Sequence, residues 1–159
     1  MINDVTGQPI NGFTLRVGLD GVTYKLVTDA SGQVSVSTAD LALGSYSVSV
    51  TFNGGTKYYP SAATETIIVK ADTAVLVDYD DNGKLLVATL INDVTGQPIK
   101  GFTLRVNLNG VTYKLVTDAN GQVSVSTADL APGTYTAVVT FLGGTKYYHS
   151  NATVTIVKD

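Results

Sequence analysis

The chain has no cysteine and no tryptophan, and among its 159 residues there is one histidine, His149, and one glutamate, Glu65. The absence of cysteine excludes disulfides, thiolate catalysis and cysteine-based zinc sites. A single histidine and a single glutamate leave few groups for general acid and base catalysis. We expect both residues to lie on the surface, and the sequence predicts that the protein is not an enzyme.

Charge and long apolar runs are also scarce. Charged residues make up 14 % of the chain, the formal net charge is -3, and no segment concentrates the ten lysines and arginines. A nucleic-acid partner is not expected, because phosphate binding needs a basic stripe. No apolar run approaches the roughly 20 residues that span a bilayer. No signal-like leader opens the sequence, so an extracellular location would place the signal and the anchor outside this chain.

Two copies of one unit fill the sequence. Residues 1–70 and 90–159 align without gaps at an offset of 89, and about 53 of the 70 pairs are identical. Repetition favours a spacer or a multivalent binder, because a catalyst usually needs one unique group of residues. We expect two domains, residues 1–70 and residues 71–159. The first domain lacks a counterpart of residues 71–89.

Short alternations of apolar and polar residues, separated by turn residues, run through each copy. Asp20-Gly21 and Asn109-Gly110 predict type I′ hairpin turns, in which both central residues take positive φ. Tyr46 and Tyr135 follow the glycine that opens a long strand, a position suited to a tyrosine corner. The predicted fold is all-β: tandem immunoglobulin-like Greek-key β-sandwiches with about seven strands in the complete unit. In the second copy the expected strands are 73–79, 84–92, 102–108, 111–117, 123–126, 134–141 and 153–157.

Three motifs occur in the same order in both copies: Asp-x-Thr-Gly-Gln-Pro-Ile, Thr-Asp-Ala-x-Gly-Gln-Val and Leu-Ala-x-Gly-x-Tyr. This order resembles the tandem Ig-like repeats of prokaryotic surface proteins, especially adhesin-like proteins of archaeal methanogens. It is also similar to Cna B-type and carboxypeptidase-regulatory modules. The resemblance implies an Ig-like repeat at the cell surface, with a role in cell adhesion.

The likeness to Cna B-type modules raises the question of an internal isopeptide bond. Such modules start the bond from a lysine at the position that is Ile2 or Ile91 here. Asn151, near the last strand, is Ala62 in the other copy. We therefore expect no internal crosslink.

The missing front segment leaves the first repeat with an open edge and a thin core. Unpaired strand edges pair readily with other chains. Two explanations stay open: a neighbouring repeat of the parent protein supplies the strand, or molecules exchange strands and form a homo-oligomer.

Tyrosine pairs follow a Gly-Gly loop in both copies, and exposed aromatic rings can stack on sugars. Alternation predicts that one ring of each pair points inward and one outward. The pairs either stiffen the loop or contact a surface glycan. The candidate glycan residues are Tyr58, Tyr59, Tyr147 and Tyr148.

Asp78, Asp80 and Asn82 match the first half of an EF-hand calcium loop, but Thr89 stands where a bidentate glutamate is expected. A plain hairpin turn and a weak calcium site, with Asp72 as a further ligand, are both open. We expect no other cofactor.

The function predicted from the sequence is a structural stalk or spacer repeat of a cell-surface adhesin-like protein. The alternative is a carbohydrate-binding Ig-like module that uses the tyrosines beside the Gly-Gly loops.

Overall fold

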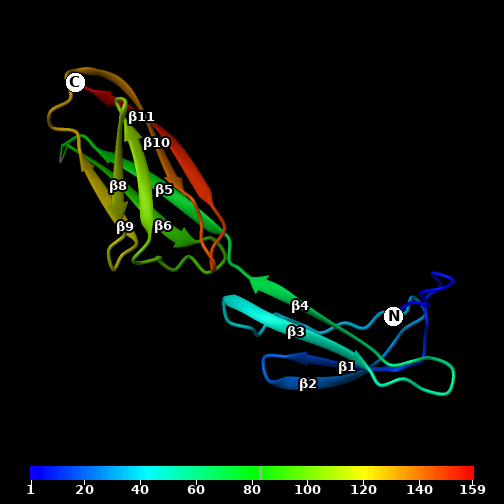
Figure 1. Cartoon of the computed structure of the whole chain (residues 1–159). Coiled ribbons are helices and arrows are strands. Elements are labelled where there is room, and N and C mark those ends of the chain that lie inside the picture. Colours follow the sequence, from blue (N-terminus) through cyan, green and yellow to red (C-terminus); the bar gives the residue numbers. More distant parts are fainter. Residues whose placement is uncertain (83) are drawn as a thin grey trace. The chain divides into compact units, whose positions relative to one another are not determined.

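The computed structural model describes residues 1–82 and 84–159, which divide into two compact units, Met1–Val69 and Lys70–Asp159. All regular secondary structure in these residues is β, in eleven strands and three antiparallel sheets (Figure 1). The all-β prediction is confirmed.

The first unit forms a single four-stranded sheet. Its strands are β1 (Thr14–Leu19), β2 (Val22–Val27), β3 (Gly44–Phe52) and β4 (Ser61–Val69), in the order β2-β1-β3-β4. Every neighbouring pair is antiparallel. The strand β4 is therefore an edge strand of this sheet.

The second unit contains seven strands, the number predicted for a complete repeat. The same four-stranded sheet recurs in the order β11-β10-β7-β8, and a second sheet has the order β5-β6-β9. The immunoglobulin Greek-key topology stays a prediction. The strands are β5 (Thr73–Asp80), β6 (Leu85–Asn92), β7 (Thr103–Leu108), β8 (Val111–Val116), β9 (Gln122–Ser126), β10 (Gly133–Phe141) and β11 (Ser150–Lys158).

The predicted turn chemistry is confirmed in both units. Asp20 and Asn109 both have φ of 50°, and the glycine after each has φ of 76°. Positive φ at both central residues matches the right-handed twist of the flanking strands, so the turn fixes their register. The tyrosine corners are also present: the Tyr46 hydroxyl donates to the Ala42 carbonyl at 2.8 Å and the Tyr135 hydroxyl to its counterpart at 2.9 Å.

The two units differ in their cores. The core of the second unit has contributions from both sheets, including Leu86, Ala88 and Leu90 of β6, which are at most 1 % exposed. Residues 1–69 contain one sheet only, so no second sheet of this unit covers its inner face. Its buried apolar side chains are Ile10, Leu15, Val17, Leu19 and Phe52.

Candidate functional site

The first tyrosine pair lies in the loop between β3 and β4. Gly54 has φ of 83°, and the Gly55 amide donates to the Tyr58 carbonyl at 2.9 Å, so the loop closes on itself. The half-buried Tyr58 ring packs edge-to-face on Phe13, with ring centroids 5.3 Å apart. Tyr59 is 94 % exposed. One ring therefore stiffens the loop and the other is free to meet a ligand.

The second pair repeats this arrangement between β10 and β11. Tyr147 packs edge-to-face on Phe102 with ring centroids 5.2 Å apart, and the Gly144 amide donates to the Tyr147 carbonyl at 2.9 Å. Tyr148 is 48 % exposed, and the Lys70 ammonium lies 5.3 Å from its ring centroid. A cation over this ring partly covers the face that a sugar would use. Tyr59 consequently presents the more accessible stacking surface.

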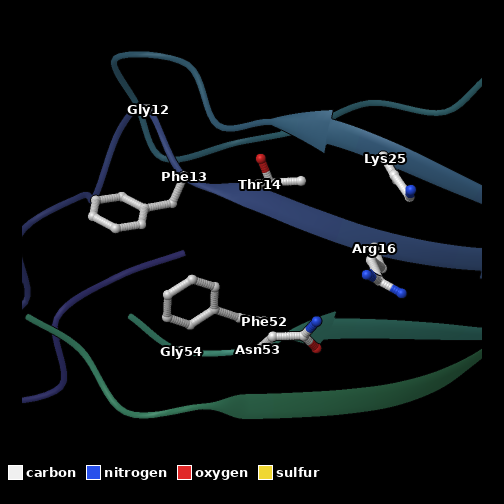
Figure 2. Close-up of a pocket in the computed structure, with 8 residues that line it drawn as sticks. All are labelled: Gly12, Phe13, Thr14, Arg16, Lys25, Phe52, Asn53 and Gly54. Carbon is white, nitrogen blue, oxygen red and sulfur yellow. The ribbon is translucent and has the colours of Figure 1, made fainter. Parts of the chain in front are cut away.

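A shallow pocket of about 410 Å³ lies beside the loop between β3 and β4, which we call the aromatic loop of the first unit. Figure 2 shows the rings of Phe13 and Phe52 at one end and the side chains of Arg16 and Lys25 at the other. Arg16 and Lys25 are cross-strand partners on β1 and β2, and both are exposed. Two adjacent cations would accept an anionic group, such as a carboxylate or sulfate.

The second unit has the same pocket, with a volume of about 460 Å³. Arg105 and Lys114 are again cross-strand partners, and Leu142 replaces Asn53 on the wall. Sequence reasoning missed both pockets. The available signal was the type I′ turn, because its two-residue loop sets the register that pairs each arginine with a lysine.

The calcium candidates lie along and just beyond β5. Asp78 and Asp80 are exposed residues of one extended strand, and Asn82 follows in the turn. An EF-hand loop folds back on itself and brings about six to eight oxygens around one Ca²⁺, whereas an extended strand presents only alternate side chains on one face. The extended strand therefore fits an EF-hand cage poorly. No group of three or more acidic or histidine side chains able to hold a metal occurs in residues 1–82 and 84–159, and weak calcium binding stays a prediction.

Two further polar arrangements lie at the same end of this unit as the calcium candidates. The Tyr79 hydroxyl donates to the Asp81 carboxylate at 2.8 Å. Burial and then this hydrogen bond raise the pKa of Tyr79. The Lys158 ammonium is buried and donates to the carbonyls of Thr127 and Ala128, at 2.6 and 2.8 Å. Both arrangements belong to the second unit alone, because Lys158 is Val69 in the first and Tyr79 has no counterpart there.

The two residues considered for acid and base catalysis are both exposed. His149 follows the second tyrosine pair, and Glu65 lies on β4. Among the described residues no helix is long and apolar enough to cross a membrane.

Comparison with known proteins gives a limited picture. No family model matches the chain, and no curated protein matches it. Solved structures with some likeness include one that concerns host cell surface retention of a bacterial ice-binding adhesin, at 20 % identity, with 92 % of this chain and 52 % of that chain covered and a TM-score of 0.40.

Two other structures have a similar degree of likeness. One is a Ca²⁺-stabilized adhesin that helps an Antarctic bacterium reach out and bind ice, at 23 % identity, 96 % and 41 % coverage, and a TM-score of 0.32. The other is the BSP domain of a biofilm-associated protein, at 18 % identity, 91 % and 25 % coverage, and a TM-score of 0.34. This chain spans about half or less of each of the three. The likeness is too weak to decide a function.

Proposed function

We propose that the chain is a structural spacer repeat of an extracellular, cell-surface adhesin-like protein, which catalyses no reaction and holds a binding element away from the cell. The duplication carries this proposal, because two units at an offset of 89 residues keep the same turns, tyrosine corners and aromatic loops. Repeated folded units add reach in proportion to their number. The motifs that resemble methanogen surface proteins support an archaeal source, with neighbouring repeats of the parent protein as partners.

The spacer role can be tested by surface display. One, two or three copies of the chain are placed between a membrane anchor and an epitope tag, and the height of the tag above the membrane is measured by super-resolution microscopy. Height should rise in proportion to copy number. A Gly/Ser linker of equal length is the control, since the end-to-end distance of a flexible chain grows only as about the square root of its length. Equal heights for chain and linker would refute the proposal.

A carbohydrate-binding role is the second candidate. The exposed ring of Tyr59 and the two cationic pockets favour a glycan that carries an acidic group. In this role Tyr58 and Tyr147 hold the loops, while Tyr59 and Tyr148 contact the sugar.

A glycan array that includes acidic glycans separates the two functions. A spacer binds nothing in any form. A carbohydrate-binding module binds a glycan, loses it in the Tyr59→Ala, Tyr148→Ala double variant, and keeps it in Tyr113→Ala. Tyr113 is a matched control, because it is an exposed tyrosine on β8, outside both loops.

A further inference from the structure

The hairpin β5–β6 completes the second unit. Its inward side chains Val75, Leu86 and Ala88 are at most 7 % exposed and belong to one core with residues of the four-stranded sheet. The strand β6 also pairs with β9, which places Ala88 opposite Val123.

Two backbone hydrogen bonds anchor the start of this hairpin. The Ala71 amide donates to the Lys146 carbonyl, and the Tyr148 amide donates to the Ala71 carbonyl, both at 3.0 Å. The Thr73 hydroxyl adds bonds to the Tyr148 carbonyl at 3.0 Å and to the Ser150 hydroxyl at 2.7 Å. These contacts fix the hairpin at the end of the sheet where β11 begins.

The first unit keeps the residues that receive this hairpin. Lys57, Tyr59 and Ser61 are identical to the three residues of the second unit that anchor it. Residues 33–37 have the same sequence as β9 but form no strand, and Val34, Val36, Val48 and Val50 are all partly exposed. Their counterparts Val123, Val125, Ala137 and Val139 are at most 6 % exposed.

The backbone contacts of Met1 mark the place in the first unit that Leu90 of β6 has in the second. In the second unit the Leu90 amide donates to the Gly121 carbonyl, and the Leu90 carbonyl accepts from Ile99. Met1 makes the equivalent contacts, donating through its amino group to the Gly32 carbonyl and accepting from Ile10. The end of a docked hairpin would therefore lie beside Met1.

We propose that the inner face of the first unit is a seat for a hairpin with the sequence of residues 71–89, supplied by another repeat of this type. The donor's Leu86 and Ala88 would lie opposite Val36 and Val34, the register that β6 adopts on β9. The added strands bury the partly exposed valines and pair with residues 33–37, which form no strand in the first unit, as in other cases of strand addition. This inference deepens the proposed function, because it names the contact by which one repeat completes another.

The chain's own hairpin cannot fill this seat in cis. The seat begins beside Lys57 and Tyr59, at the start of β4, whereas Ala71 follows closely after the end of β4 at Val69. Nine residues of strand span about 27 Å, but the two-residue step from Val69 to Ala71 reaches only about 7 Å. A hairpin already seated in another molecule is also a poor donor, because its Leu86 and Ala88 are buried in that molecule's core. The donor is therefore an unseated hairpin.

Glu65 opposes uncontrolled pairing at the open face. It occupies the position that Val154 has in the second unit, where the valine packs against the core. Glu65 is exposed on an edge strand, and an inward-pointing charge is a common protection against edge-to-edge association. A seated hairpin would partly desolvate this carboxylate. Glu65→Val should therefore tighten hairpin binding.

The test uses the full chain with a second copy of residues 71–89 placed before Met1. Hydrogen exchange of residues 33–37 and of β3 is measured by mass spectrometry. We expect exchange to slow at least tenfold and to approach the rates of β9 and β10. The matched control carries Leu86→Asp and Ala88→Asp in the added copy only, and its exchange should equal that of the unmodified chain. Unchanged exchange in the extended chain, or equal slowing in the control, overturns the proposal.

Two further measurements test the hairpin sequence by itself and the choice of its donor. A synthetic peptide of residues 71–89, added to the full chain, should slow the same exchange, and it should do so at lower concentration with Glu65→Val. Light scattering of the unmodified chain over a range of concentrations should give a monomer. A dimer whose β9 has lost protection would mean that seated hairpins exchange, which overturns the choice of donor. The exchange and light-scattering results are independent of the surface-display and glycan-array experiments, so the proposed function and this inference can fail separately.

Discussion

Val50 and Val139 occupy the same position in the two copies, on β3 and β10, but their surroundings differ. Val139 is 0 % exposed beneath the β5-β6-β9 sheet, whereas Val50 is partly exposed. Substitution of each by alanine makes the same chemical change in the same strand context. The difference between the two losses in free energy of unfolding therefore measures how much the second sheet stabilises the core position.

The size of each loss in free energy follows from the removal of two methyl groups. At the fully buried Val139, transfer and cavity contributions together should cost about 2 to 3 kcal/mol. At Val50, where water already reaches the side chain and no closed cavity can form, we expect a loss of about 1 kcal/mol in the free energy of unfolding. The lower strand propensity of alanine affects both variants equally and cancels in the comparison.

Residue-resolved amide exchange in rising urea gives the opening free energy of each sheet separately. The Val139→Ala loss should appear in β7, β10 and β11, and the smaller Val50→Ala loss in β1, β3 and β4. Equal losses, within about 0.3 kcal/mol, would refute the inference that the first unit lacks a second layer in solution.

Three other predictions concern the second unit. A Cβ at Gly121 would lie 2.5 Å from the Leu90 carbonyl oxygen, and φ there is 71°. Gly121→Ala should therefore lower the free energy of unfolding, measured by urea denaturation, by more than about 2 kcal/mol. The control is Gly96→Ala, where φ is 69° but the space is open, and its loss should be about 1 kcal/mol. Tyr135→Phe removes the hydrogen bond to the Ala131 carbonyl and should lower the free energy of unfolding by about 1 kcal/mol. An unchanged free energy would show that this bond does not stabilise the fold. The raised pKa of Tyr79 means that the folded state keeps a proton that the unfolded state loses above pH 10.0. Stability should thus fall as the pH rises from there through the folded pKa, and Tyr79→Phe should flatten this fall.

Local sequence was sufficient to predict the turns and most strands. Asn109-Gly110 predicts its own hairpin, because the positive φ of both residues is a property of the dipeptide. Residues 33–37 and 122–126 set the limit of such reasoning. Their sequences are identical, yet only the second forms a strand, because only there does β6 provide a partner.

The candidate site was predicted only in part for a related reason. The tyrosine pairs are contiguous in sequence and could be found by inspection. The cationic pockets were missed, since Arg16 and Lys25 become neighbours only through the strand register that the hairpin turn sets. The missing segment predicts an open edge and a thin core in the first unit, but the register of a completing hairpin required the paired strands of the second unit.

The first unit builds a four-stranded sheet without any second layer, and this bears on the folding order of the second. The strands β7, β8, β10 and β11 share their connectivity and much of their sequence with that sheet. Their contacts should already be formed in the transition state for folding, with β5 docking afterwards. Destabilising substitutions in β10 should then slow folding, whereas those in β5 should mainly speed unfolding.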